Sequence, residues 1–249
     1  MEADEYARLD ETEAAHWWFA AIHALVVASL RRRPGAPGLP WLDAGCGTGG
    51  LLAHLEAAFP ARPLIGIDIA AAALMHARAK TGAGLLRGSV DALPIADASV
   101  GAAVAIDVLC HRAVDPGAAL AELRRVLAPG GALLINMPAH RWLHSVHDER
   151  VHNRRRFARR EIQDMLAAAG FEAIDAHHWN SLPFPALLLQ RKVLTRFARG
   201  PARSDVAPVP VALDRCMRAV MRVERELLSA GLRLPFGGSI LAAARRPAR

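Results

Sequence analysis

The order of apolar and polar positions along the chain predicts strands that alternate with helices. Short apolar runs typical of buried strands are followed by stretches whose apolar residues recur at helical spacing. Strands are predicted at residues 41–43, 64–67, 84–87, 100–106, 132–137, 171–179 and 239–244. Helices are predicted at residues 11–32, 51–59, 70–80, 116–127, 159–169 and 213–230, with a further basic helix that ends near residue 199. This alternation favours a parallel sheet with helices on both faces.

A glycine-rich turn follows the first predicted strand. Residues 41–50 read Trp-Leu-Asp-Ala-Gly-Cys-Gly-Thr-Gly-Gly, and helical spacing resumes directly afterwards. Without side chains, the backbone of such a turn lets a nucleotide-like ligand approach the N–H groups at the start of the helix. The stretch fits the dinucleotide pattern G-x-G-x-x-G. It also fits the pattern G-x-G-x-G, in which Gly45, Gly47 and Gly49 are preceded by Asp43.

Asp43 discriminates between the two classes of ligand. A carboxylate at the end of the strand repels a pyrophosphate and attracts an ammonium group. S-adenosylmethionine carries an ammonium group and no phosphate, so it is the predicted cofactor, held by Asp43, Gly45, Cys46, Gly47 and Gly49. A dinucleotide coenzyme and a turn with a purely structural role are the alternatives.

The sequence of residues 43–49, Asp-Ala-Gly-Cys-Gly-Thr-Gly, resembles the first motif of the class I S-adenosylmethionine-dependent methyltransferases, and further matches extend over about residues 41–180. Residues 16–19, 147–149 and 154–157 resemble one bacterial subgroup of that family, whose members act on small molecules. The resemblance implies an α/β fold with a Rossmann-like, doubly wound sheet of seven strands, mostly parallel, with an antiparallel last strand. It also implies an N-terminal helical lid and a helical insertion before the last strand.

The whole chain is expected to form a single methyltransferase domain. Its predicted parts are the N-terminal lid (1–38), the cofactor-binding core (39–180), the helical insertion (181–236) and the last strand with the tail (237–249). The insertion could wall the substrate site, form a dimer surface or rest on a membrane. Because its basic and apolar residues are mixed, a substrate wall is favoured over membrane contact. A monomer and a homodimer both stay open.

Composition narrows the classes of partner. The formal net charge is +7, which attracts acidic small molecules or an anionic surface. Aromatic residues make up only 5% of the chain and no basic run is interleaved with stacking rings, so nucleic acid is disfavoured as a partner. The three cysteines stand far apart, and the acidic start of the sequence lacks the order of a signal peptide. A cytoplasmic location is therefore expected.

Residues after the next two predicted strands are expected to hold the adenosyl part of the cofactor. Asp68 stands 19 residues after the last glycine of G-x-G-x-G, close to the spacing of an acid that accepts hydrogen bonds from a ribose. Its alternative role is to cap the helix of residues 70–80. Ile69 is expected to flank the adenine. In the family an acid often contacts the adenine where this chain has Ser89, so the resemblance implies contacts from the Ser89 hydroxyl and the Val90 backbone.

Two further elements complete the predicted cofactor site. In the resembling family the N-terminal helix covers the cofactor, which implies that Trp17 and Trp18 close over it. The alternative is that the two tryptophans anchor this helix in the core. Asp107 and His111 follow the buried strand 100–106, at the edge where open α/β sheets bind ligands. Both can reach cofactor or substrate there; Asp107 is assigned to the cofactor site and His111 to the catalytic site.

The catalytic chemistry is assigned to the polar stretch of residues 138–160, which leaves the fifth strand at the same edge. Methyl transfer to a neutral oxygen or nitrogen requires the loss of a proton, and histidine titrates near neutral pH. The predicted general base is His147, and Asp148 or its neighbour Glu149 orients it. Two other histidines of the stretch are alternatives, His144 and His152. A metal site is not expected, because adjacent residues such as His147 and Asp148 rarely converge on one ion.

The sequence thus predicts an enzyme that transfers a methyl group from S-adenosylmethionine to an oxygen or nitrogen of a small, acidic metabolite in a biosynthetic tailoring pathway. Arg154, Arg155 and Arg156 can bind a carboxylate or phosphate bidentately, although three consecutive side chains cannot share one face. Two other functions stay open, namely methylation of RNA and binding of S-adenosylmethionine without catalysis.

Overall fold

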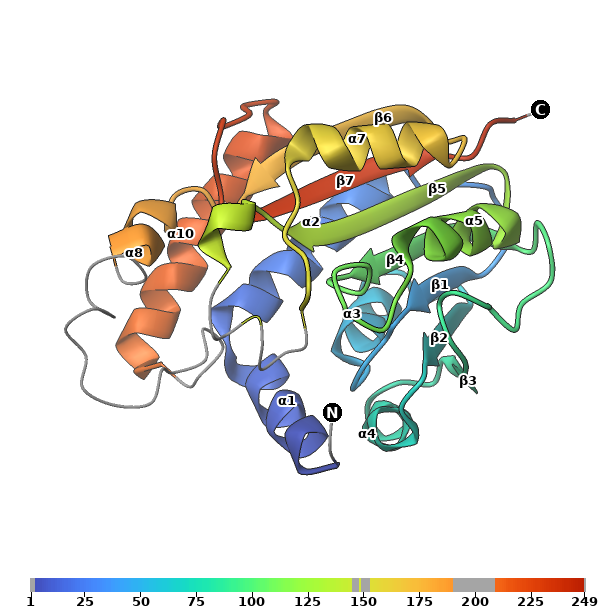
Figure 1. Ribbon diagram of the computed structural model, residues 1–249. Coiled ribbons are helices and arrows are strands. Elements are labelled where there is room, and N and C mark those ends of the chain that lie inside the picture. The colour runs from blue at the N-terminus through green and yellow to red at the C-terminus, as the bar shows by residue number, and fades with distance from the viewer. Residues whose placement is uncertain (1–2, 145–147, 149–152, 190–208, 249) are drawn as a thin grey trace.

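A seven-stranded sheet runs through the middle of the molecule, as the computed structural model shows for residues 3–144, 148, 153–189 and 209–248 (Figure 1). The strands are β1 (Trp41–Ala44), β2 (Leu64–Asp68), β3 (Gly84–Arg87), β4 (Val100–Ile106), β5 (Leu127–Pro138), β6 (Glu172–Trp179) and β7 (Ser239–Arg245). The helices are α1 (Ala3–Ala15), α2 (Trp17–Arg32), α3 (Gly50–Ala58), α4 (Ala71–Lys80), α5 (Pro116–Val126), the short η1 (Arg141–Leu143), α7 (Arg159–Ala168), α8 (Phe184–Leu189) and α10 (Val211–Ser229).

The order of the strands creates a ligand-binding edge next to β1. The strands lie in the order β3-β2-β1-β4-β5-β7-β6. The strands from β3 to β5 are parallel, and β7 runs antiparallel to both of its neighbours. This confirms the predicted doubly wound sheet with an antiparallel last strand. The strand order reverses between β1 and β4, and in such sheets ligands bind in the crevice at the carboxyl ends of these strands.

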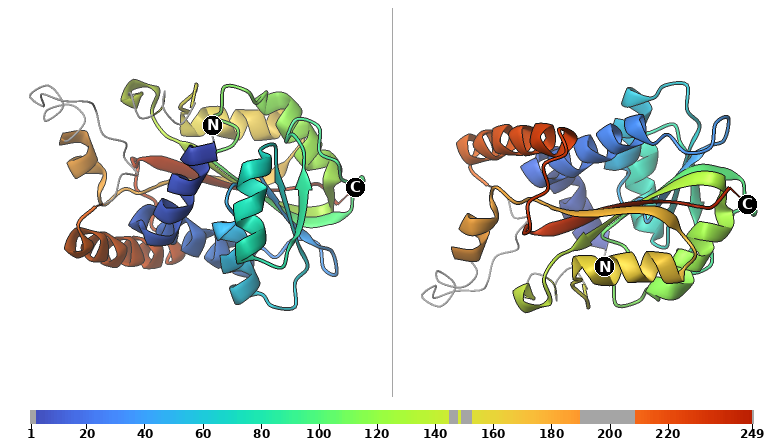
Figure 2. Two further views of the ribbon diagram at one scale, coloured as in Figure 1. Left: turned by 90° about the horizontal axis from the view of Figure 1, so that it is seen from below. Right: turned by 90° about the horizontal axis from the view of Figure 1, so that it is seen from above.

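Two apolar cores hold the layers together, one on each face of the sheet. Figure 2 shows α5 and α7 on one side and α2, α3 and α10 on the other. On the first side, Leu123 of α5 and Leu166 of α7 are fully buried. On the second side, Val26 of α2 and Leu52 of α3 are fully buried. Burial of these apolar stripes fixes the helices against the strands whose ends form the ligand edge.

The helix predicted for residues 11–32 is two helices, so that prediction was wrong in its boundaries. The chain bends by 70° at His16, between α1 and α2. His16 has an extended backbone and its Nδ1 accepts a hydrogen bond from the N–H of Trp18 (3.2 Å), which caps α2 and starts a new helix. Within the described ranges no single helix is long and apolar enough to cross a bilayer; Leu9–Ala15 and Trp17–Arg32 meet that test only as a bent pair.

The second helix of the predicted insertion, α10, is anchored to the N-terminal helices. The N–H of Trp17 donates to Asp214 Oδ1 (2.7 Å), and Arg32 Nη1 donates to Ser229 Oγ (3.2 Å) near the other end of α10. Figure 1 shows α10 and α2 beside each other behind the sheet. The last predicted helix is therefore confirmed, whereas the basic helix predicted to end near residue 199 falls largely outside the described residues. The division of the chain into lid, core, insertion and tail stays a prediction.

Candidate functional site

The glycine turn between β1 and α3 has one position that is open to a ligand. Gly45, Gly47 and Gly49 have φ angles of 83°, 52° and 84°, a region that glycine enters without the steric cost of a side chain. A Cβ on Gly45 would lie 2.4 Å from a methyl carbon of Val108, and one on Gly49 would lie 2.8 Å from Ala77. A Cβ on Gly47 would meet no atom within 4 Å. A ligand can therefore approach the backbone most closely at Gly47.

Asp43 carries a carboxyl group that is buried next to this turn. Its residue is 3% exposed, and burial, followed by the negative charges of Glu13 and Asp68, raises the pKa of the Asp43 carboxyl to about 8. No ion pair joins Asp43 to a basic side chain in the part of the chain that the structure describes. A bound ammonium group would supply the missing positive charge, so the donor set fits the amino-acid end of S-adenosylmethionine.

Asp68, at the end of β2, ties the glycine turn to the start of α4. Its Oδ2 accepts a hydrogen bond from the N–H of Gly47 (2.9 Å), and its Oδ1 accepts one from the N–H of Ala70 (2.9 Å). Ala70 is itself the N-cap of α4, so Asp68 supports the start of that helix from two residues away. Each carboxylate oxygen can accept a second hydrogen bond, and the predicted contact with a ribose is compatible with this geometry. Ile69 beside it is 64% exposed, although it is apolar.

The loop after β3 is held by its own hydrogen bonds. The hydroxyl of Ser89 accepts a hydrogen bond from the N–H of Asp91 (3.3 Å), and the side chain of Val90 is buried in the core under α5. The predicted adenine contacts of Ser89 and Val90 stay predictions. Cys46, in the glycine turn, is also buried, and burial raises the pKa of its thiol.

Glu13 of α1 fastens the N-terminal helix to the glycine turn. Its carboxylate accepts hydrogen bonds from the hydroxyl of Thr48 (2.5 Å) and the N–H of Gly50 (3.1 Å), and it pairs with Lys80 of α4 (3.0 Å). Gly50 is the first residue of α3, so its N–H has no acceptor within the helix, and the Glu13 carboxylate supplies one. The negative charge also interacts favourably with the N-terminal end of the helix dipole. Sequence reasoning missed this residue, because its partners lie 35 or more positions away.

Replacing Glu13 by glutamine should lower the free energy of unfolding by about 1 kcal/mol, because the neutral amide weakens the charge-assisted hydrogen bonds. For a chain of this size the melting temperature should fall by roughly 2–4 °C. Thermal denaturation and limited proteolysis at α1 measure the effect. The matched control is Glu11→Gln, since Glu11 is exposed on the same helix. Equal melting temperatures for the two variants would contradict the anchoring role.

Trp17 and Trp18 pack against the core between α2 and the sheet. Both are partly buried, and the rings of Trp18 and Trp179 lie with their centroids 5.7 Å apart. This packing supports the interpretation that the tryptophan pair anchors the helix. Their predicted contact with the cofactor stays a prediction.

Asp107 follows β4 and is held by a short chain of hydrogen bonds. Trp179 Nε1 donates to Asn136 Oδ1 (2.7 Å), and Asn136 Nδ2 donates to Asp107 Oδ1 (2.8 Å). Asp107 has a φ of 54°, which is uncommon for a residue with a side chain. Burial raises the pKa of its carboxyl to about 7. A carboxyl group at the ligand edge with a near-neutral pKa suits either a cationic ligand or proton transfer.

The loop after Asp107 is packed rather than open. Cys110 is fully buried, and its single S–H has two acceptors in reach, the carbonyl of Asp107 (3.0 Å from Sγ) and Asn153 Oδ1 (3.1 Å). His111 is half-buried and forms an isolated β-bridge with Asn153. Burial and these contacts give Cys110 a packing role. The catalytic role of His111 stays a prediction.

Asp148 forms a buried ion pair with Arg156. Arg156 Nε lies 3.0 Å from both carboxylate oxygens, its Nη2 lies 2.9 Å from Oδ1, and its Nη1 donates to the carbonyl of Ala139 (3.0 Å). The side chains are 0% and 5% exposed. The Asp148 carboxylate is thus bound to an arginine. The predicted base His147, together with Glu149 and His152, lies outside the described residues, and His144 is exposed.

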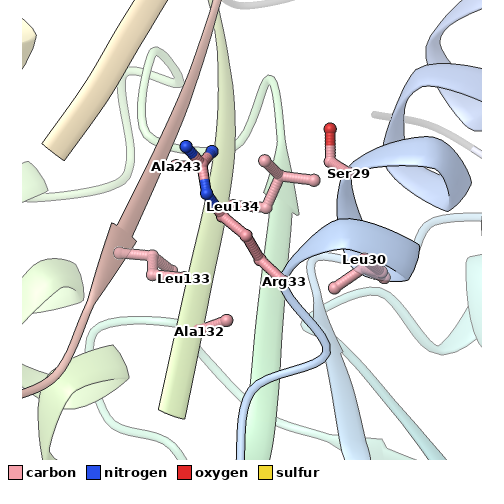
Figure 3. Close-up of a pocket in the computed structure, with 7 residues that line it drawn as sticks. All are labelled: Ser29, Leu30, Arg33, Ala132, Leu133, Leu134 and Ala243. Atoms are coloured by element: carbon pink, nitrogen blue, oxygen red, sulfur yellow. The ribbon is translucent and has the colours of Figure 1, made fainter. Parts of the chain in front are cut away.

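A small cavity on the far edge of the sheet is unrelated to this site. It has a volume of about 10 Å³, between the end of α2 and strands β5 and β7 (Figure 3). Seven residues line it: Ser29, Leu30, Arg33, Ala132, Leu133, Leu134 and Ala243. A space of this size holds at most one water molecule. It offers no room for a cofactor or a metabolite.

The sequence of this chain is similar to those of known methyltransferases. Residues 42–135 match the family profile described as a methyltransferase domain. The chain is 34% identical over 155 residues to a malonyl-[acyl-carrier protein] O-methyltransferase of Methylococcus capsulatus, covering 57% of this chain and 55% of that protein. The chain spans about half the length, or less, of the curated relatives that it matches.

Solved structures share the fold over nearly the whole chain. A SAM-dependent methyltransferase of Thermotoga maritima is 21% identical, with a TM-score of 0.61 and coverage of 98% of this chain and 95% of that one. Phosphoethanolamine N-methyltransferase 2 of Haemonchus contortus, solved with S-adenosyl-L-methionine, is 18% identical, with a TM-score of 0.59 and coverage of 90% and 52%. At these identities the likeness shows the fold.

Proposed function

The chain belongs to the class I S-adenosylmethionine-dependent methyltransferase family, and on that premise we propose that it transfers the methyl group of S-adenosylmethionine to an oxygen or nitrogen of a small metabolite. We further propose that the reaction belongs to a biosynthetic tailoring pathway and that the acceptor is acidic. The bound cofactor supplies an electrophilic methyl group on a sulfonium centre. The chain's own residues hold that cofactor, orient the acceptor and take up its proton.

The proposal depends above all on the buried carboxyl group of Asp43. Among the described residues the buried carboxyl group of Asp43 has no basic partner, and burying such a group lowers the stability of the fold. Costly buried groups of this kind are typical of functional sites, here a site for a cationic ligand. The open position at Gly47 lies in the turn that follows Asp43. A ligand with its ammonium group at Asp43 can therefore contact the glycine backbone at the same time. Asp68 accepts hydrogen bonds at the next strand end, where the ribose is proposed to lie.

Two groups are proposed for the proton of the acceptor. His147 is the proposed general base, since a histidine titrates near neutral pH and its stretch leaves β5 at the ligand edge. Asp107 is the second candidate, because Asn136 and Trp179 fix its carboxyl group at the end of β4. By their names, two of the similar proteins act on oxygen or nitrogen, a malonyl-[acyl-carrier protein] O-methyltransferase and a phosphoethanolamine N-methyltransferase. A third, a ubiquinone/menaquinone biosynthesis C-methyltransferase of Syntrophotalea carbinolica, acts on carbon by its name.

Binding of S-adenosylmethionine should release a proton. The pKa of Asp43 is about 8 in the ligand-free protein, so the group is mostly protonated at pH 7. An ammonium group beside it favours the carboxylate, and the affinity should rise by up to about tenfold per pH unit between about pH 6 and pH 8. Isothermal titration calorimetry in two buffers with different ionisation enthalpies measures the released proton. Titration with NAD is the control, and tight binding of NAD without binding of S-adenosylmethionine would overturn the proposal.

The remaining alternatives differ in their observable products. An RNA methyltransferase would bind RNA with an affinity that falls steeply as salt is added. A protein that only binds the cofactor would form no S-adenosylhomocysteine when isotopically methyl-labelled S-adenosylmethionine is mixed with fractions of a small-metabolite extract. Label transferred to a small molecule supports the proposed function.

A further inference from the structure

A cavity lined by arginines opens at the ligand edge of the sheet. Its volume is about 490 Å³. Six residues line it: Arg141, His144, Arg154, Arg155, Arg156 and Glu161. Four arginines and one glutamate give the lining a formal charge of +3 with the histidine neutral. A concave surface of one sign of charge concentrates ligands of the opposite charge.

The cavity lies beside the strand ends at which methyl transfer is proposed. The N–H of Arg154 donates to the carbonyl of Cys110 (3.0 Å), in the loop that follows Asp107 and β4. Three residues later, the N–H of Phe157 donates to the carbonyl of Pro138 (2.9 Å), the last residue of β5. The arginine segment therefore crosses from the end of β4 to the end of β5. An anion held by this segment would place the rest of its molecule next to the proposed methyl site.

The arginines of the cavity are not equivalent. Arg156 is buried, and the carboxylate of Asp148 occupies its guanidinium group from one side. Arg141 pairs with Glu161 (2.7 Å) and is largely exposed. Arg155 uses one nitrogen to reach the carbonyl of Val114 (3.2 Å). The ion pair between Asp148 and Arg156 shows how a carboxylate is bound here, namely by the guanidinium group of one arginine.

The remaining arginines approach the cavity from two segments of the chain. Arg141 stands on η1, whereas Arg154 and Arg155 belong to the crossing segment. A planar carboxylate suits a single guanidinium fork, while the oxygens of a phosphoryl group accept hydrogen bonds from several directions. Arginines that converge from different segments therefore match a phosphoryl group better than a carboxylate.

We propose that this cavity binds the phosphate or diphosphate group of the methyl acceptor, so that the acceptor is a phosphorylated small molecule. The proposal rests on the proposed function, because it places the acceptor beside the cofactor. Glu161 acts in it as an internal competitor, since its carboxylate pairs with Arg141 when no phosphoryl group is bound. The remaining volume accommodates the part of the acceptor that carries the reacting atom.

Inorganic pyrophosphate is the probe that tests this site. Calorimetric titration at low salt, with S-adenosylhomocysteine present, should show binding to the wild-type chain. Arg154→Ala and Arg155→Ala should each weaken that binding about tenfold or more, because each removes a charge-assisted hydrogen bond. Glu161→Gln should strengthen it several-fold by removing the competing charge. The matched control is Arg222→Ala, an exposed arginine of α10 on the opposite face of the sheet, which should leave the affinity unchanged.

Four results would overturn the proposal. They are the absence of binding at millimolar pyrophosphate, equal weakening in Arg222→Ala, tighter binding of malonate than of pyrophosphate, and competition between pyrophosphate and S-adenosylhomocysteine. Absence of binding, or equal weakening in the control variant, would mean that the arginines form no specific anion site. Tighter binding of malonate would assign the cavity to a carboxylate, and competition with S-adenosylhomocysteine would place the anion in the cofactor site. Titration of each sample with S-adenosylhomocysteine alone separates these failures from a failure of the proposed function, which would show as no binding of that ligand to the wild-type chain.

Discussion

Replacing Asp43 by asparagine should weaken binding of S-adenosylmethionine by roughly 30-fold or more, while the ligand-free protein becomes more stable. The first effect follows because the variant offers the buried ammonium group no charged partner, and truncating one side of such a pair costs about 2–5 kcal/mol. The second effect follows from the buried carboxyl group, whose burial no bound cation offsets in the ligand-free chain.

The stability gain should depend on pH in a defined direction. The pKa of Asp43 is about 8 in the folded chain, against 3.8 for an ordinary aspartate side chain. Between these values the unfolded chain releases the proton and the folded chain keeps it, so wild-type stability falls as the pH rises from about 4 to about 8. The asparagine variant lacks this loss. Its advantage should therefore be smallest near pH 4 and grow by about 1.4 kcal/mol per pH unit up to about pH 8.

Thermal denaturation from pH 5 to pH 8 and calorimetry with S-adenosylmethionine measure the two effects on the same variant. The matched control is Asp164→Asn, because Asp164 is exposed on α7. It should change neither affinity nor the pH dependence of the melting temperature. A variant at position 43 that loses affinity and stability together would mean that Asp43 holds the fold and not the ligand. Retained affinity would remove Asp43 from the cofactor site.

The sheet and the glycine turn could be predicted from the sequence because both depend on local patterns. The turn at Gly45 to Gly49 follows a short apolar strand, and its positive φ angles are what closely spaced glycines permit. The strand ends at Asp68 and Asp107 could be located because apolar runs stop there. These elements place the glycine turn, Asp68 and Asp107 at one edge of the sheet without knowledge of any long-range contact.

The contacts that fix the site could not be predicted, because they join residues far apart in the chain. Glu13 reaches the start of α3, and Trp179 reaches Asp107 through Asn136. One signal was available for the second case. Asn136 is a polar residue inside the apolar strand β5, and a buried amide of this kind is almost always hydrogen-bonded. The bend at His16 gave no comparable signal, since histidine is not among the common N-cap residues.

The largest loss of stability should come from Arg156→Ala. This change leaves the Asp148 carboxylate buried without its bidentate partner and also removes the hydrogen bond to the carbonyl of Ala139. Removal of one member of a buried ion pair costs about 3–5 kcal/mol. The neighbouring variant Arg154→Ala is the matched control, because Arg154 is exposed and its replacement should cost less than about 0.5 kcal/mol. Urea denaturation of both variants measures the difference.

A double variant separates a structural role of Asp148 from a catalytic one. Asp148→Asn together with Arg156→Ala removes both charges, so the double variant should recover a part of the stability that Arg156→Ala loses. If Asp148 serves the fold alone, the double variant should also methylate at nearly the wild-type rate at a saturating concentration of the acceptor, which offsets the loss of Arg156 from the lining of the anion-binding cavity. If Asp148 orients His147, methylation should stay low although stability returns. Equal stability of Arg156→Ala and Arg154→Ala would contradict the buried pair itself, and the arginine segment would then need another anchor to cross from β4 to β5.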